Sequence, residues 1–80
     1  MKILVIGLGS MGKRRIRNLK LLNKKNISGF DVNKKRCTDI NKQYKIPTYK
    51  NFNKALKYQK PNLLIISTPP DMHYSHAYKA

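Results

Sequence analysis

The chain has 80 residues, of which 18 are Lys or Arg and 3 are Asp or Glu, so its formal net charge is +15. This length provides for one small domain and excludes a two-domain enzyme within these residues. A hydrophobic share of 40% predicts a folded unit and excludes a purely basic tail. The single cysteine, Cys37, excludes an internal disulfide framework and a cysteine-based zinc site.

The sequence contains no targeting or membrane segment that we can identify. No stretch approaches the roughly 20 apolar residues that a membrane-spanning helix needs. The start has the character of a short signal peptide, but Lys13, Arg14 and Arg15 stand where a cleavage site should be small and uncharged. We therefore expect a cytoplasmic protein.

The first part of the chain predicts a strand, a helix and a second strand. Residues 3–6 are a continuous aliphatic run, typical of a strand buried on both faces of a parallel sheet. Residues 11 to about 23 have the period of an amphipathic helix. Its inward face is predicted to carry Gly12, Ile16, Leu19 and Asn23. Residues 26–31 then predict a short strand.

Asparagines are predicted to cap the next two helices, Asn33 for the first and Asn51 for the second. The first of these helices carries an apolar stripe, formed by Cys37, Ile40 and Tyr44. Pro47 ends it and permits a short strand through Tyr49. The second must end before Pro61.

The last part of the chain begins with a second strongly apolar strand at residues 63–66. Thr68-Pro69-Pro70 ends this strand, and Asp71 can cap a final helix beginning near Met72. The alternation of strands and helices predicts an α/β fold with right-handed crossovers. We predict a partial Rossmann fold, a four-stranded parallel sheet in the order 3-2-1-4 with helices on both faces. The fourth strand should keep an exposed edge, through which copies would associate into a homo-oligomer.

A glycine motif stands between the first strand and the first helix. Residues 7–12 read Gly-Leu-Gly-Ser-Met-Gly, a G-x-G-x-x-G pattern in the context of a dinucleotide-binding turn. The first glycine permits a tight turn, the second lets a pyrophosphate approach the backbone, and the third lets the helix pack closely on the sheet. The helix N-terminus attracts the phosphates. The predicted cofactor-binding residues here are Gly7, Leu8, Gly9, Ser10, Met11 and Gly12.

Asp31 completes this pattern, because it ends the second strand 19 residues after Gly12. A carboxylate there accepts hydrogen bonds from the ribose hydroxyls of adenosine and repels a 2′-phosphate, which favours NAD over NADP. Lys34, Lys35 and Arg36 follow directly, so a 2′-phosphate would still meet a cation, and NADP stays as the alternative.

The run from Ile65 through Ala77 carries a second signal, with Thr68, Pro69 and His73 after the fourth strand. Together with the glycine motif and Asp31, this run resembles the N-terminal cofactor domain of the Gfo/Idh/MocA family of NAD(P)-dependent oxidoreductases. The resemblance covers essentially all 80 residues. It implies that Thr68, Pro69 and His73 line the nicotinamide and ribose side of the cofactor. Pro70 stands where the family commonly has Asn.

The resemblance also implies what these residues do not contain. The family's catalytic lysine, in a Glu-Lys-Pro motif, and its substrate domain would lie beyond Ala80. We therefore expect residues 1–80 to form a single dinucleotide-binding domain, the N-terminal fragment of an oxidoreductase acting on a sugar or cyclic polyol. No residue present is nominated as catalytic, and the isolated chain should have no dehydrogenase activity.

Two other interpretations stay open. A charge of +15 attracts nucleic acid non-specifically at low salt, although the cations are spread from Lys2 to Lys79 and the glycine motif has no role in such binding. The second open interpretation is that the chain is a non-functional remnant of a longer gene. His73 and His76 lie three residues apart, but a metal site is not expected, because no Cys and only one acid, Asp71, lies near them.

Overall fold

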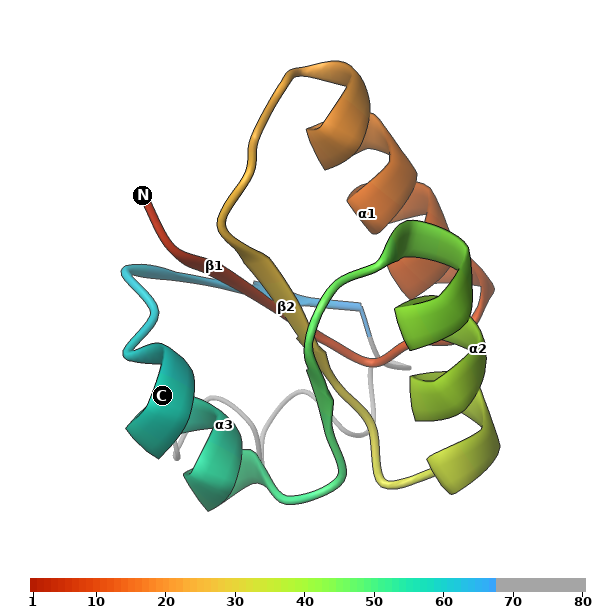
Figure 1. The fold of residues 1–80 in the computed structure, drawn as a ribbon, viewed down its shortest axis with the longest axis vertical. Helices are drawn as coiled ribbons and strands as arrows, with labels where there is room; N and C mark the ends of the chain where they lie inside the picture. The colour runs from red at the N-terminus through yellow and green to blue at the C-terminus, as the bar shows by residue number, and fades with distance from the viewer. Residues whose placement is uncertain (68–80) are drawn as a thin grey trace.

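The computed structural model describes residues 1–67, in which strands and helices alternate (Figure 1). The elements are β1 (Ile3–Ile6), α1 (Ser10–Leu21), β2 (Ile27–Phe30), α2 (Lys34–Tyr44), β3 (Thr48–Tyr49), α3 (Phe52–Gln59) and β4 (Leu63–Ile66). The predicted alternation is confirmed over this range. The helix predicted from near Met72 lies outside the described residues.

The four strands form one parallel sheet in the order β3-β2-β1-β4. Ile3 at the start of β1 stands opposite Ile27 of β2 and Leu63 of β4. The predicted partial Rossmann fold and its strand order are therefore confirmed. Because β2 and β4 flank β1 on opposite sides, the sheet has its switch point at β1, where α/β sheets bind their ligands.

Helices cover both faces of the sheet, as predicted (Figure 1). On one face Val5 packs with Ile16 of α1 and Ile40 of α2, and all three are fully buried. On the other face the ring of Phe52 from α3 meets that of Phe30, with centroids 5.4 Å apart in an edge-on arrangement. The alternation of side chains along β1 thus supplies two separate apolar cores.

β4 is less buried than β1, although both are aliphatic throughout. Within residues 1–67 it pairs with β1 alone, so one edge has no strand beside it. Leu63 is 42% exposed, and the other three residues are half-buried. The exposed edge accords with the sequence-based expectation, and association of copies through it stays a prediction. Within the described part of the chain no helix has the length and apolar character to cross a membrane.

The prediction that Asn23 lies on the inward face of the first helix is wrong. α1 ends at Leu21, and Asn23 takes a left-handed conformation with a φ of 61°. The N–H of Asn23 donates to the carbonyl of Lys20, and that of Lys24 donates to the carbonyl of Leu19. This pair of bonds is a Schellman motif, in which Asn is one of the few residues that tolerate the left-handed position.

The predicted caps of α2 and α3 are confirmed. The Asn33 side chain accepts a hydrogen bond from the N–H of Arg36 at 3.1 Å, and that of Asn51 accepts from Lys54 at 2.9 Å. Both helices end at lysines with left-handed backbones, Lys45 (φ 55°) and Lys60 (φ 46°). A residue with a Cβ is strained in this conformation, which glycine adopts freely.

We expect Lys45→Gly to raise the free energy of unfolding by about 1 kcal/mol, because glycine removes the strain of the left-handed backbone. Urea denaturation followed by circular dichroism measures the change. Lys42→Gly is the matched control: it removes the same charge inside α2 and should lower stability by a similar amount. A fall in stability for Lys45→Gly would contradict the left-handed backbone conformation of Lys45.

Candidate functional site

The glycine loop joins β1 to α1 at the carboxyl end of β1. Gly7 has a φ of 95°, a conformation that favours glycine, and its N–H donates to the carbonyl of Phe30 at 2.8 Å. Gly12 is buried in the first turn of α1, where a Cβ would overlap the carbonyl oxygen of Gly7. The loop therefore requires glycine at both ends for the turn and for the close packing of the helix on the strand.

Gly9 differs from these two, because the fold does not require glycine there. Its backbone is extended, with φ −75° and ψ −159°, and a Cβ would meet only the guanidinium of Arg36 at 3.6 to 3.9 Å. That distance is an ordinary van der Waals contact. The missing side chain leaves the outer surface of the loop accessible, which is the property that a ligand approaching the backbone needs.

The N-terminus of α1 opens onto this loop. Gly9 occupies the capping position and has no side chain to bond the free N–H groups, and the first turn contains no acidic residue. The first intrahelical bond runs from the N–H of Lys13 to the carbonyl of Gly9 at 2.9 Å. The N–H groups of Ser10, Met11 and Gly12 thus precede the helical ladder, and the positive end of the helix dipole points the same way. Such a terminus attracts anions.

Leu8, for which the sequence predicts a cofactor contact, has its side chain on the inner side of the loop. Its side chain is fully buried in the core beneath α1 and α2. Its N–H donates to the carboxylate oxygen Oδ2 of Asp31 at 2.9 Å. The turn at Gly7 breaks the alternation of β1 and carries the Leu8 side chain into the core that contains Val5, and the carboxylate takes its N–H. The role of Leu8 is to anchor the loop.

Asp31 is the acceptor that holds this arrangement together. Only 6% of the residue is exposed, and its second carboxylate oxygen, Oδ1, accepts from the N–H of Asn33 at 2.8 Å. The carboxylate therefore ties the end of β2 to the glycine loop on one side and to the start of α2 on the other. The sequence predicted the position of Asp31 for a ribose, but gave no sign of these internal bonds.

Arg36 brings a cation to the same place. Its Nη1 lies 3.5 Å from Oδ2 of Asp31, and its side chain is 54% exposed. The same guanidinium lies next to Gly9, because a Cβ added to Gly9 would lie 3.6 Å from its Nη1. Of the three cations that follow Asp31 in sequence, Arg36 is thus the one whose contacts place it beside the loop.

Ser67 is a polar residue at this edge that we did not nominate from the sequence. It follows β4 directly, and its N–H donates to the carbonyl of Ile6 at 2.7 Å, next to Gly7. The residue is 6% exposed, and its hydroxyl has no hydrogen-bond partner within residues 1–67. The sequence signal that could have identified it is a polar residue directly after the aliphatic run of residues 63–66. Thr68, Pro69 and His73, predicted for the nicotinamide side, lie outside the described residues.

Cys37 packs as a small buried side chain on α2, as predicted. Its Sγ lies 3.3 Å from the carbonyl oxygen of Asp31 and 3.4 Å from that of Tyr49, which share the single S–H donor, and burial raises the pKa of the thiol. Cys37 therefore joins α2 to the ends of β2 and β3. Among residues 1–67 no group of three or more His, Cys, Asp or Glu side chains is placed to hold a metal ion.

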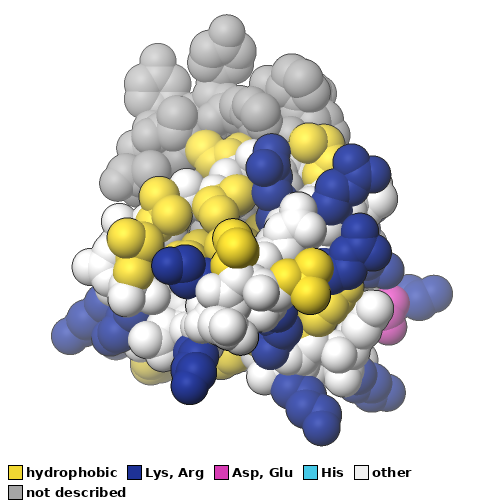
Figure 2. Space-filling model, turned by 90° about the horizontal axis from the view of Figure 1, so that it is seen from above, with side chains coloured by type: hydrophobic (Ala, Val, Ile, Leu, Met, Phe, Trp, Pro, Cys, Tyr) yellow, Lys and Arg dark blue, Asp and Glu magenta, His cyan; other side chains and the backbone are white. Residues whose placement is uncertain are grey.

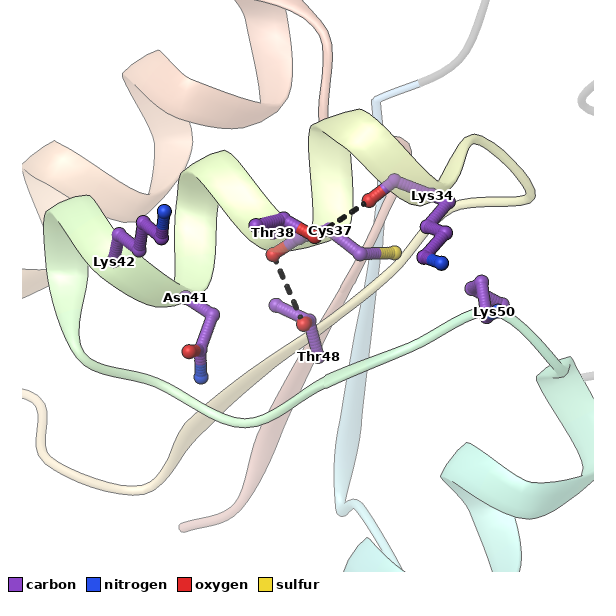
Figure 3. A pocket seen from close by; sticks show the side chains of 7 residues that line it. All are labelled: Lys34, Cys37, Thr38, Asn41, Lys42, Thr48 and Lys50. Carbon is purple, nitrogen blue, oxygen red and sulfur yellow. Dashed lines mark hydrogen bonds between the residues drawn. The ribbon is translucent and has the colours of Figure 1, made fainter.

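A hollow of about 270 Å³ lies between α2 and β3 (Figure 3). Its lining residues are Lys34, Cys37, Thr38, Asn41, Lys42, Thr48 and Lys50. The hydroxyl of Thr48 donates to the carbonyl of Cys37 at 3.0 Å, and that of Thr38 donates to the carbonyl of Lys34 at 3.1 Å. These polar groups already serve the packing of helix and strand, so we place the candidate site at the glycine loop instead.

Comparison with known protein families identifies the family to which this chain belongs. A sequence model of the Gfo/Idh/MocA oxidoreductases, described as a NAD-binding Rossmann fold, matches residues 1–80. The chain belongs to this family. No curated protein and no solved structure matches it. Membership confirms the resemblance seen in the sequence and identifies residues 1–80 as a NAD-binding domain of the oxidoreductase type.

Gly9 and Gly12 of the loop should differ in their tolerance of a methyl group. We expect Gly12→Ala to lower the free energy of unfolding by about 3 kcal/mol, because the new Cβ would displace the backbone of Gly7. Gly9→Ala should leave stability almost unchanged, since its Cβ meets only a flexible guanidinium. Thermal unfolding of the two variants measures the difference. Equal losses would contradict the described packing of the loop.

Proposed function

We propose that this chain binds a nicotinamide dinucleotide at the glycine loop, as the cofactor-binding part of an oxidoreductase that acts on a sugar or cyclic polyol. One observation carries the proposal: the open loop at the end of β1 is bonded to a buried carboxylate at the end of β2. A helix N-terminus without a cap lies beside them. This combination supplies N–H groups for a pyrophosphate and a carboxylate near the adenosine ribose.

The residues present fit such a ligand. The N–H groups of Ser10, Met11 and Gly12 would hold the pyrophosphate, and the bare backbone of Gly9 would let it approach. When bound, the dinucleotide supplies or accepts the hydride. Within residues 1–67 there is no histidine, and the carboxylate of Asp31 already has three partners, so we assign no acid or base there. The proposed role of this region is binding and orientation.

The choice between NAD and NADP depends on two opposing charges. The carboxylate of Asp31 repels a 2′-phosphate and favours NAD. Arg36, half-exposed and 3.5 Å from that carboxylate, offers a guanidinium that pairs well with a phosphate. We propose NAD as the preferred cofactor, with NADP accepted when Arg36 turns from Asp31 to the 2′-phosphate.

Nucleic-acid binding is the second candidate, which the net charge of +15 favours. Figure 2 shows Lys and Arg side chains on several parts of one face of the molecule, and the outward side of α1 carries Arg14, Arg15 and Arg17. Within residues 1–67 the structure contains one ion pair, between Arg36 and Asp31. The remaining cations would attract any polyanion at low salt, without sequence preference.

One titration series separates the two functions. We expect calorimetry to detect NADH binding at both about 50 and about 500 mM salt, because backbone N–H groups contribute beyond screened charge. Binding of a DNA duplex should fall steeply over the same range. Gly9→Trp should reduce NADH affinity at least tenfold, whereas Asn18→Trp, on an exposed position of α1, should not. DNA binding without any dinucleotide signal would refute the proposed function.

Arg36→Ala tests the cofactor preference. We expect the variant to bind NADPH at least tenfold more weakly, because a guanidinium–phosphate pair is lost and the Asp31 carboxylate is left to repel the 2′-phosphate. NADH affinity should change much less. Lys35→Ala removes the same charge from the neighbouring, exposed position and serves as the control. Equal weakening of NADPH binding in both variants would assign the effect to general charge.

A further inference from the structure

Within the described part of the chain, the hollow between α2 and β3 is lined by three basic side chains and no acidic one. Lys34 is the first residue of α2, Lys42 lies in its last turn, and Lys50 directly follows β3. All three residues are exposed, and within residues 1–67 their ammonium groups form no ion pair and donate no hydrogen bond. Like charges from separate segments thus surround one hollow, and a bound anion would offset their repulsion.

The hollow lies on the other side of α2 from the candidate dinucleotide site. Lys34, Thr38 and Asn41 are spaced at i, i+4 and i+7, so they form one stripe along the helix that faces the hollow. Arg36 comes two residues after Lys34, a rotation of about 200° around the helix axis, and its guanidinium lies beside Gly9. A ligand in the hollow would therefore lie apart from the glycine loop.

The positive charges stand at two ends of the hollow. Figure 3 shows Lys34 and Lys50 near each other at one end and Lys42 at the other. Eight residues of helix separate Lys34 from Lys42, which corresponds to about 12 Å along the axis. Between the two ends lie the uncharged polar side chains of Thr38, Asn41 and Thr48 (Figure 3). This arrangement suits a ligand that is anionic at both ends and polar in the middle.

The middle of the hollow can still bond a ligand, although its side chains serve the packing of helix and strand. The hydroxyls of Thr38 and Thr48 donate their hydrogens to backbone carbonyls, so their oxygens keep lone pairs that can accept from a ligand hydroxyl. The Asn41 amide donates one of its two hydrogens to the carbonyl of Ile46. The volume of about 270 Å³ lies just below the roughly 300–1,000 Å³ of pockets for drug-sized ligands, so the ligand is small.

We propose that this hollow binds a small hydroxyl-bearing ligand with a phosphate group at each end, of the sugar bisphosphate type. One phosphate would pair with Lys34 and Lys50, and the other with Lys42. The hydroxyls between them would donate to the threonine oxygens. The inference is independent of the proposed function, because none of the lining residues belongs to the glycine loop.

Two probes test the two-ended site: fructose bisphosphate, with two phosphates separated by sugar hydroxyls, and inorganic phosphate, with one. Nuclear magnetic resonance of the isotope-labelled chain, at about 50 mM salt to limit screening, follows the backbone amide signals of Thr48 and Lys50. We expect both probes to shift these signals. The bisphosphate should bind about fivefold more tightly, the upper range for one further exposed ion pair.

Three single variants separate the two ends from general charge. Lys50→Gln should weaken both probes about fivefold. Lys42→Gln should weaken the bisphosphate by a similar factor and leave inorganic phosphate unchanged, because that probe binds at the end with two lysines. Lys35→Gln is the matched control: it removes the same charge from an exposed position of α2 outside the hollow and should change neither affinity.

Each of four results would overturn the inference. The first is that the parent chain binds neither probe. The second is equal weakening in Lys35→Gln and Lys50→Gln, which would assign the binding to net charge. The third is a bisphosphate affinity that Lys42→Gln leaves unchanged, which would refute the two-ended site. The fourth is displacement of the bisphosphate by NADH, which would place it at the dinucleotide site and leave the proposed function standing.

Discussion

The hydrogen bond from the N–H of Leu8 to the buried carboxylate of Asp31 connects the glycine loop to the end of β2, and the rest of the site depends on it. A buried carboxylate needs several donors to offset its loss of water. Asp31 obtains them from Leu8, from Asn33 and from the guanidinium of Arg36. The same group thus positions the loop, starts α2 and holds a cation beside Gly9, so three parts of the candidate site share one anchor.

The charge of the chain has a limited part in this arrangement. With 18 basic and 3 acidic side chains, most basic side chains have no acidic partner available. The ion pair found within residues 1–67, between Arg36 and Asp31, lies at the candidate site. The surrounding positive potential would raise the local concentration of any phosphate-bearing ligand. It does not account for glycine at Gly7 and Gly12, which the backbone conformation and the close helix packing require. The geometry of the loop explains these glycines, whereas charge does not.

The places where sequence-based prediction succeeded and failed have separate physical reasons. The caps at Asn33 and Asn51 were predictable, because each side-chain oxygen accepts a hydrogen bond from the N–H only three residues later in the chain. The end of α1 was not, because Asn23 fits both an extended helix pattern and a left-handed terminus, and the Schellman bonds decide between them. For Leu8 the motif marks the backbone, whereas only the tertiary structure shows that the side chain is buried in the core.

The sequence by itself determined the order of the elements, the strand-turn-helix context of the glycine motif and the presence of a carboxylate at the end of β2. These follow from apolar periodicity and from local turn and cap chemistry, which act over a few residues. Only the tertiary structure decided that the Asp31 carboxylate bonds the loop and the start of α2, and that Arg36 lies over Gly9. It also decided that the Ser67 hydroxyl is buried with no hydrogen-bond partner within residues 1–67. Each of these depends on strands and helices far apart in the chain being packed at one edge of the sheet, and local sequence patterns do not encode such distances.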